Sequence, residues 1–321
     1  MNKSLIFVFA CVMAGLSIPT QAQPAVSALV LDTSKLRLAS ANVLVLDAQA
    51  GLPIYSKGAD SVTPIASVTK LMTAMVVLDS GLPLDETLSI GIQDLDILKG
   101  THSRLTPGAE LSRRDMLRLA LMASENRAAS SLARHYPGGV AAFVAAMNRK
   151  AASLGMAHTY FRDATGLTSE NVSTANDLAL MVRAAADYEL IREFTTTPSH
   201  YVEVQPTGRI LGFNNTNSLV RAGQWDIQVS KTGFIREAGK CLVMLANIAS
   251  RPVVIVLLDS YGKLTRVGDA MRVKHWIETG EAMPAARAIK VGATRGRHGI
   301  KGTFTKVAIP ARPVKVRPRR V

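Results

Sequence analysis

The chain has 321 residues, of which 48% are hydrophobic and 19% are charged. This composition indicates a globular protein, excludes an intrinsically disordered chain, and provides enough residues for one large domain or two ordinary domains. The formal net charge is +14, but eleven Lys or Arg residues fall between Arg287 and Arg320, and no acidic residue follows Glu281. The rest of the chain is therefore only mildly basic.

The N-terminal residues have the pattern of a secretory signal peptide. Met1-Asn-Lys3 carries a positive charge, an apolar stretch covers residues 5–18, and small or polar residues follow up to Ala22. These are the three parts of a signal peptide, and the apolar stretch is too short to favour a membrane-spanning helix. We expect residues 1–22 to be removed by cleavage and the product to be exported.

Cysteine and histidine usage argues against disulfide and metal chemistry. Once the signal peptide is removed, Cys241 is the sole cysteine, so an intramolecular disulfide is excluded. Its strand-like surroundings favour a small buried hydrophobe over a reactive thiol. The six histidines show no metal-ligand spacing, and we expect neither a metal site nor a cofactor.

In chain order, the first predicted elements are two short strands. Residues 41–47 are an apolar run typical of a buried strand, and a turn over residues 47–51 leads into a second strand over residues 53–57. A loop containing Pro64 follows. The apolar run after it predicts a buried helix from Ser67 to about residue 79.

The middle of the chain is predicted to be helical. Ser112-Arg-Arg-Asp115 resembles a capping box that opens a helix ending near Ala123. Gly155 is a suitable C-terminal stop for a later helix. The further helices are predicted over residues 127–133, 140–154 and 174–188.

The pattern changes to β-rich runs near residue 226. Three such runs, joined by short polar turns, predict an antiparallel meander, and a closing helix is predicted over residues 263–278. The three strands are expected over residues 226–232, 240–248 and 252–258. The order of elements predicts the α/β class, with an antiparallel sheet flanked by helices and a helical subdomain inserted between the strands.

Three short motifs have residue types that suit acyl transfer. They are Ser67-Val-Thr-Lys70, Ser124-Glu-Asn126 and Lys231-Thr-Gly233. A serine is a poor nucleophile unless a base lies within hydrogen-bond reach. On a helix, a spacing of three residues places Ser67 and Lys70 on the same face.

Two of these motifs recur, so neither pattern is decisive by itself. Ser260-Tyr-Gly-Lys263 repeats S-x-x-K and Ser169-Glu-Asn171 repeats S-E-N, whereas K-[ST]-G occurs once. Ser67 precedes an apolar run suited to a buried helix, but Ser260 follows a strand-like run and lies after the K-T-G motif. Order and context therefore favour the first set of three.

The first two motifs suggest catalytic roles. Ser67 at a helix N-terminus lies in positive potential, and Lys70 serves as its base when burial and a second cation, Lys231, lower the Lys70 pKa. Ser124 is expected to relay a proton to the leaving amine, and the Asn126 amide is expected to hold a substrate carbonyl. Each residue also has a structural alternative, for example a helix cap for Ser67 or a solvated charge for Lys70.

The third motif suggests substrate binding. Lys231 and Thr232 offer a cation and a hydroxyl to a substrate carboxylate or amide, and Gly233 lets the substrate backbone approach closely. The backbone N–H groups of Ser67 and Phe234 are expected to stabilise the oxyanion. The structural alternative for Lys231 is a charge that protects an edge strand from aggregation.

These residues resemble the penicillin-binding DD-peptidases and serine β-lactamases, whose signatures are S-x-x-K, S-x-N and K-[ST]-G. The similarity extends over about residues 41–280. Segments 122–130, 136–139, 173–177 and 231–234 are similar to the low-molecular-mass D-alanyl-D-alanine endopeptidases of the penicillin-binding protein 7 type. The resemblance implies a β-lactamase/transpeptidase-like fold, which we place at residues 23–281.

The resemblance also implies a function. It implies a periplasmic serine endopeptidase that cleaves D-alanyl–diaminopimelate cross-links between peptidoglycan peptide stems through an acyl-enzyme on Ser67, with penicillins as covalent inhibitors. A D-alanyl-D-alanine carboxypeptidase is the nearest rival, but those relatives carry a C-terminal β-rich domain, and only a basic segment follows Gly280. Two further classes stay open, a β-lactamase and a non-catalytic peptidoglycan-binding protein. Glu170 is the nearest candidate for a β-lactamase deacylating residue, although its surroundings resemble the endopeptidase pattern.

The basic segment over residues 282–321 is rich in Gly and Pro and has little apolar periodicity. One interpretation is a solvated, poorly ordered tail. The second is an electrostatic tether to an anionic envelope polymer or lipid surface. Nucleic acid is not expected as a partner, because an exported protein rarely meets it.

Overall fold

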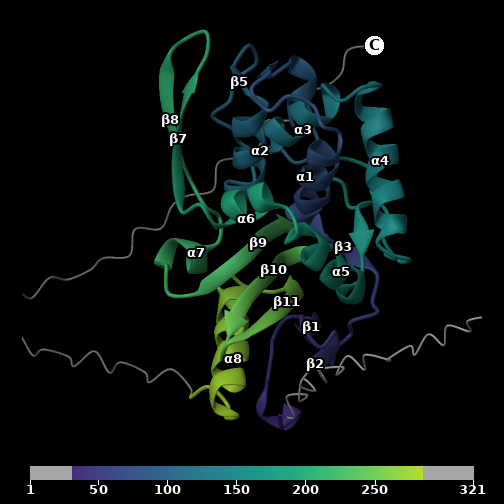
Figure 1. Ribbon diagram of the computed structural model, residues 1–321, viewed down its shortest axis with the longest axis vertical. Helices are drawn as coiled ribbons and strands as arrows, with labels where there is room; N and C mark the ends of the chain where they lie inside the picture. The colour runs from purple at the N-terminus through teal and green to yellow at the C-terminus, as the bar shows by residue number, and fades with distance from the viewer. Residues whose placement is uncertain (1–30, 285–321) are drawn as a thin grey trace, which may run out of the picture. The chain divides into compact units, whose positions relative to one another are not determined.

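The computed structural model describes residues 31–284 (Figure 1). The predicted signal peptide lies outside these residues, as does the predicted basic tail apart from residues 282–284, so the signal peptide, the tail and the domain boundaries stay predictions. Within residues 31–284 no helix is long and apolar enough to cross a membrane.

A five-stranded antiparallel sheet forms the lower layer in Figure 1, with strand order β2-β1-β11-β10-β9. Its strands are β1 (Asn42–Asp47), β2 (Leu52–Lys57), β9 (Asp226–Ile235), β10 (Gly239–Ile248) and β11 (Arg251–Ser260). β1 pairs with β11 and so joins the N-terminal hairpin to the C-terminal meander. The predicted hairpin and meander are confirmed, and β9 continues beyond its predicted end to Ile235.

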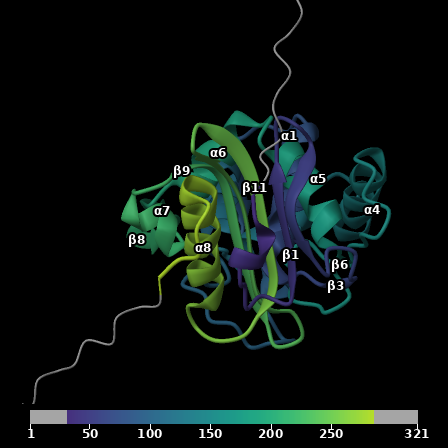
Figure 2. The same ribbon diagram turned by 90° about the horizontal axis from the view of Figure 1, so that it is seen from below.

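Alternate side chains of the central strands enter two separate apolar cores. Val43 and Val45 of β1 face the core shared with α8 (Thr265–Thr279), which lies against one face of the sheet (Figure 2). Leu44 and Leu46 face the core on the other side. This period of two is the side-chain alternation of a strand that is buried on both faces.

The second core joins the sheet to a helical subdomain, which we define as α1 to α6. α5 and α6 pack on the sheet, and α1 to α4 lie above it in Figure 1. These helices are α1 (Lys70–Asp79), α2 (Arg113–Met122), α3 (Asn126–Arg134), α4 (Gly139–Ser153), α5 (Ala175–Ala185) and α6 (Glu189–Thr196). Ser112 caps α2 as predicted, since its hydroxyl accepts from the Asp115 N–H at 3.0 Å.

The structure differs from the prediction between residues 174 and 225. The helix predicted over 174–188 ends at Ala185, and α6 begins after Tyr188, whose backbone is extended (φ −93°, ψ 113°). The sequence pattern indicates no element over residues 189–225. The structure has a projecting hairpin there, formed by β7 (Ser199–Val204) and β8 (Arg209–Asn214), and then α7 (Ser218–Ala222) (Figure 1).

Short strands complete the connections around the helices. They are β3 (Thr63–Pro64), β4 (Thr87–Ser89), β5 (Glu110–Ser112) and β6 (Val172–Ser173). β3 pairs with β6 and β4 pairs with β5. The β3–β6 pair fixes the loop before β6 beside the segment that leads into α1.

Candidate active site

Ser67 lies on a short 3-10 helix, η2 (Ala66–Thr69), that leads directly into α1. The helix predicted from Ser67 therefore starts with a tighter turn. Ala66 has a left-handed φ of +48°. Buried Gly166 packs against this turn, and a Cβ at Gly166 would lie only 2.0 Å from the Ala66 carbonyl oxygen. A glycine is thus required where the two backbones meet.

Lys70 is fully buried and reaches the serine of the first motif. Its Nζ lies 2.9 Å from Ser67 Oγ, 2.7 Å from Asn126 Oδ1 and 2.6 Å from the Thr165 carbonyl oxygen. The predicted pairing of Ser67 with Lys70 is therefore present. The structure also brings Asn126 of the second motif to the same amine.

Burial lowers the pKa of Lys70 to about 7, although the nearby Asp163 and Glu125 carboxylates oppose this shift. A large fraction of the side chain is then neutral near neutral pH, as a general base requires. Burial is the leading cause of the Lys70 shift, and repulsion between the charged forms of the two lysines lowers the pKa of Lys231.

Lys231 lies on β9 and contacts the serine of the second motif. Its Nζ donates to Ser124 Oγ at 2.9 Å and to the Thr232 carbonyl oxygen at 2.8 Å. Burial, then the charges of Lys70 and Arg266, lower the pKa of Lys231 well below its ordinary value. Ser124 itself has a positive φ of +59°, a strained conformation for a residue other than glycine.

Asn126 is the first residue of α3, and its amide has partners on both sides. Oδ1 accepts from Lys70, and Nδ2 donates to Thr101 Oγ1 at 3.0 Å. Glu125, the middle residue of the motif, caps α3 by accepting from the Arg127 N–H at 3.2 Å. This contact gives Glu125 a structural role as a helix cap.

The third motif runs along β9, the edge strand of the sheet. Thr232 Oγ1 donates to Thr216 Oγ1 at 2.7 Å. A Cβ at Gly233 would lie 3.0 Å from the Ile65 carbonyl oxygen and 3.1 Å from the Ser67 nitrogen, so β9 passes close to the nucleophile's turn. The Phe234 side chain at the end of this motif is exposed.

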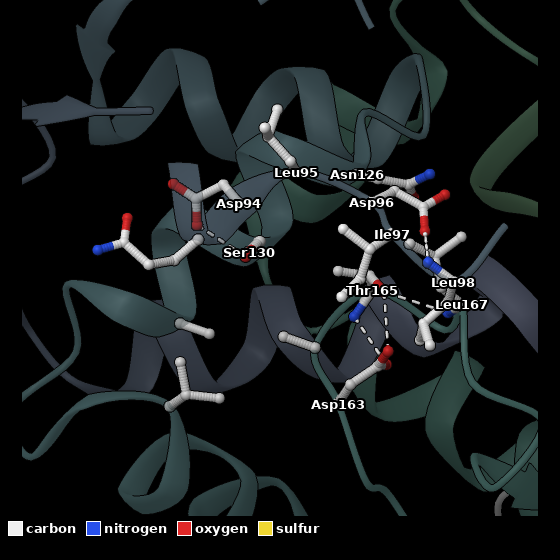
Figure 3. Close-up of a pocket in the computed structure, with 14 residues that line it drawn as sticks. Asp94, Leu95, Asp96, Ile97, Leu98, Asn126, Ser130, Asp163, Thr165 and Leu167 are labelled. Carbon is white, nitrogen blue, oxygen red and sulfur yellow. Dashed lines mark hydrogen bonds between the residues drawn. The ribbon is translucent and has the colours of Figure 1, made fainter. Parts of the chain in front are cut away.

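A pocket of about 300 Å³ opens beside two partners of Lys70 (Figure 3). Asn126 and Thr165 belong to its wall, and the loops over residues 93–98 and 163–167 supply most of the rest. Figure 3 shows the apolar side chains of Leu95, Ile97 and Leu167 on this lining. The pocket provides an apolar space next to the buried amine.

Several residues that stand out in the sequence lie outside this site. Ser260 is buried at the end of β11, where its Oγ is 2.6 Å from Ser40 Oγ, while Ser169 is exposed. Cys241 is fully buried, and burial raises the pKa of its thiol to about 11, which confirms the predicted inert role. Among residues 31–284 no group of three or more His, Cys, Asp or Glu is placed to hold a metal ion.

The residues that support the motifs were not predicted from the sequence. Thr165 gives Lys70 its carbonyl acceptor, and Thr216 accepts from the Thr232 hydroxyl. Arg266, in the first turn of α8, donates to the Gly233 carbonyl oxygen at 2.8 Å. These residues come from segments far from their partners in the chain, and no spacing pattern marks them.

Comparison with known proteins agrees with this arrangement. Residues 30–262 match the Peptidase S11 family, described as D-alanyl-D-alanine carboxypeptidase. The chain is 53% identical over 251 residues to a D-alanyl-D-alanine endopeptidase of Pseudomonas aeruginosa, and the match covers 78% of this chain and 81% of that protein. It is 49% identical over 255 residues to a D-alanyl-D-alanine endopeptidase of Escherichia coli, with coverage of 79% and 82%.

A solved structure shows the same likeness. Penicillin-binding protein D2 from Listeria monocytogenes, in its cefotaxime-bound form, has a TM-score of 0.67 and 31% identity, and the match covers 75% of this chain and 98% of that chain. The predicted fold, an antiparallel sheet with helices of the β-lactamase/transpeptidase type, is confirmed. The chain belongs to the Peptidase S11 family and is a serine DD-peptidase.

Proposed function

We propose that the chain is a D-alanyl-D-alanine endopeptidase that cleaves peptidoglycan cross-links through an acyl-enzyme on Ser67. The observation that carries the proposal is the contact of a fully buried Lys70 amine, with a pKa lowered to about 7, to Ser67 Oγ at 2.9 Å. The names of the relatives from Pseudomonas aeruginosa and Escherichia coli support the choice of an endopeptidase.

In the proposed acylation step, neutral Lys70 removes the proton from the Ser67 hydroxyl as Oγ attacks the D-alanyl carbonyl carbon. The backbone N–H groups of Ser67 and Phe234 stabilise the oxyanion. The tetrahedral intermediate then collapses and the C–N bond breaks. Ser124, which accepts from Lys231, donates a proton to the leaving amine and regains one from Lys231. The proton that Lys70 took from Ser67 then restores Lys231.

Deacylation follows the same path with water in place of serine. Lys70 takes a proton from the water as its oxygen attacks the ester carbonyl, and Lys70 then returns that proton to Oγ of Ser67 as the bond between Oγ and the acyl carbon breaks. Penicillins acylate Ser67 in the same way, but their leaving group stays attached to the acyl part. We therefore expect a long-lived adduct with penicillin, where a β-lactamase would turn the drug over rapidly.

The proposed substrate contacts follow the edge strand. An extended stem peptide adds to β9 by backbone hydrogen bonds, and Gly233 leaves room for it. Lys231 and the Thr232 hydroxyl face the substrate carboxylate or amide, and Asn126 holds a backbone carbonyl. Since the Asn126 amide contacts Thr101 and Lys70 here, its substrate contact uses the remaining N–H.

Purified cross-linked muropeptide dimers test the choice of bond. We expect the full chain to release monomers and Ser67→Ala to release none. Loss of terminal D-alanine without release of monomers would make the chain a carboxypeptidase. If the folded protein binds the dimers but releases neither monomers nor terminal D-alanine, the result would support a non-catalytic peptidoglycan-binding protein.

We also propose a periplasmic location, on the signal-like residues 1–22, and an anionic envelope surface as the partner of the basic segment 287–321. The segment carries eleven Lys or Arg and no acid, so its attraction to anionic polymer or lipid is electrostatic and screened by salt. Deleting residues 287–321 is expected to reduce salt-sensitive binding to cell-wall sacculi and anionic vesicles. Unchanged binding would leave the segment as a solvated tail.

A further inference from the structure

The loop of residues 96–101 reaches the active site through one side chain, Thr101. Thr101 Oγ1 accepts from Asn126 Nδ2 at 3.0 Å and donates to Asp96 Oδ2 at 2.7 Å. Asn126 Oδ1 in turn accepts from Lys70 Nζ at 2.7 Å. Three hydrogen bonds thus connect the Asp96 carboxylate to the Lys70 amine. Figure 3 shows Asp96 and Asn126 at the same wall of the pocket.

The Asp96 carboxylate gives this chain of hydrogen bonds its direction. It accepts from the backbone N–H groups of Leu98 and Lys99, both at 2.9 Å, and of Thr101 at 2.8 Å. Partial burial raises the pKa of Asp96, but the bonds from Thr101, Lys99 and Leu98 lower it overall, so the group is ionised. An ionised carboxylate only accepts, and a hydroxyl has one hydrogen.

The Thr101 hydroxyl therefore donates to Asp96 and has only a lone pair for Asn126. Only the amide NH₂ of Asn126 is able to donate to that lone pair, so Nδ2 faces Thr101 and Oδ1 faces Lys70. The Asp96–Thr101 contact thus fixes which way the Asn126 amide is turned.

The orientation of Asn126 decides where the lone pair of neutral Lys70 points. A neutral amine has two hydrogens and one lone pair, and Nζ has three neighbours. Asn126 Oδ1 and the Thr165 carbonyl oxygen only accept, so they take the two hydrogens. The lone pair is left for the Ser67 hydroxyl at 2.9 Å. A reversed Asn126 amide would instead place an N–H against Nζ and compete for the lone pair.

We propose that Thr101 is a positioning residue for acylation: by fixing the Asn126 amide, it directs the Lys70 lone pair to the Ser67 hydroxyl. The inference rests on the proposed function, because it takes Lys70 as the base. Thr101 acts through Asn126 and has no contact with the reacting atoms in the proposed mechanism.

Thr101 also affects the pH dependence of acylation. Besides the two lysines themselves, the charged groups that act on Lys70 and Lys231 are Asp163, Glu125 and Arg266. None of these charges changes when Thr101 is substituted. Losing the Thr101 oxygen lets the Asn126 amide reverse. An N–H donor beside Nζ disfavours the ammonium form, so the pH midpoint of acylation moves down.

The test measures the second-order rate of acylation of the full chain by a fluorescent penicillin, from about pH 5 to about pH 9. Thr101→Val keeps the side-chain shape and removes the hydroxyl. We expect its plateau rate to fall about tenfold, the effect of losing one hydrogen bond, and its midpoint to shift to lower pH. Thr101→Ser restores both values. Ser103→Ala, which removes a hydroxyl from the adjoining segment, keeps the wild-type profile.

A second variant protects the test against a folding defect. Thr101→Ala removes the same hydroxyl but leaves a different side-chain shape, and it is expected to give the same downward shift. Thermal unfolding is recorded for every variant. A Thr101→Val profile that matches wild type would overturn the proposal. So would a slower rate with an unshifted midpoint, or a Thr101→Ser variant as slow as Thr101→Val. Absence of labelling in the wild type would contradict the proposed function instead.

Discussion

Gly166 lies beneath the turn that carries Ser67, with a φ of +79° and no room for a side chain. An added methyl group would meet the Ala66 carbonyl oxygen and displace that turn. We expect Gly166→Ala to lose about 2–4 kcal/mol of unfolding free energy, because the cost of overpacking adds to the cost of a positive φ. Urea unfolding measures the loss.

Gly155→Ala is the matched control for this substitution. Gly155 has a φ of +76° but nothing within 4 Å of a built Cβ, so the variant carries only the backbone strain, about 1 kcal/mol. If the two variants lose the same unfolding free energy, the close approach of Gly166 to Ala66 does not contribute to the cost of the Gly166→Ala substitution.

Lys70 makes the stability of the fold depend on pH. Its pKa is about 7 in the folded chain, against an ordinary value of 10.5, so between these values the unfolded chain binds a proton that the folded chain does not. Stability from this group therefore rises as the pH rises from about 7 to about 10.5. Lys70→Met removes this dependence. It also relieves the repulsion on Lys231, which brings the pKa of Lys231 closer to its ordinary value. Both effects make the unfolding free energy depend less on pH.

Chemical unfolding of wild type and Lys70→Met at a series of pH values checks this prediction. As the pH rises from about 7 to about 10.5, the unfolding free energy of wild type is expected to increase relative to that of Lys70→Met. A difference that stays constant would mean that Lys70 is not buried as a neutral amine.

At the scale of elements, the Asn171 side chain makes several of the hydrogen bonds that hold the loop before β6. Its Nδ2 donates to Thr69 Oγ1 and to the Asp163 carbonyl oxygen, each at 3.0 Å, and its Oδ1 accepts from the Arg162 N–H at 2.7 Å. Asn171 is fully buried, so Asn171→Ala removes these hydrogen bonds and leaves a cavity, and it is expected to cost about 2–4 kcal/mol of unfolding free energy, as measured by urea unfolding.

Glu170→Ala is the neighbouring control. Glu170 lies in an exposed pair with Arg162 at 3.7 Å, so its removal is expected to change stability by less than about 0.5 kcal/mol and to leave the lifetime of the penicillin adduct unchanged. Faster or slower release of the drug from Glu170→Ala would revive the β-lactamase interpretation, in which Glu170 activates water.

Elements with strong local patterns are the ones that the sequence predicts well. The buried runs of β1, β10 and β11 and the capped start of α2 are examples. The β7–β8 hairpin has a weaker local pattern, because only two of the six residues of β7 are buried, and its register depends on contacts across the hairpin, such as the Tyr201 ring against Gly212. Pro206-Thr-Gly208 is the turn signal that marks it.

At the scale of the whole described chain, the site draws on both the sheet and the helical subdomain. Lys231 comes from β9, Asn126 from α3, and Ser67 from the turn between them in the fold. The ion pair of Lys99 with Glu237 at 2.6 Å links the loop beside Asn126 to the turn after β9. A substitution in either part is therefore able to disturb the other.

The same organisation explains which site residues the sequence reveals. The motif residues stand at fixed local spacings, so Ser67 and Lys70 are recognisable from the S-x-x-K pattern together with the order of the motifs and the apolar run that follows. Thr101, Thr216 and Arg266 act on motifs that lie far away in the chain, and only the fold brings them into contact. The Lys231–Ser124 hydrogen bond joins residues 107 positions apart, which no spacing rule anticipates.

Intact mass spectrometry after incubation with a penicillin tests the acyl-serine on which the proposed mechanism depends. We expect the mass to increase by one drug molecule, with the adduct mapped to the peptide that contains Ser67. Ser67→Ala is expected to stay unmodified, and Ser169→Ala, which alters the exposed serine of the second S-E-N motif, is expected to be labelled like wild type. An adduct on another residue, or one retained by folded Ser67→Ala, would contradict the assignment of Ser67 as the nucleophile.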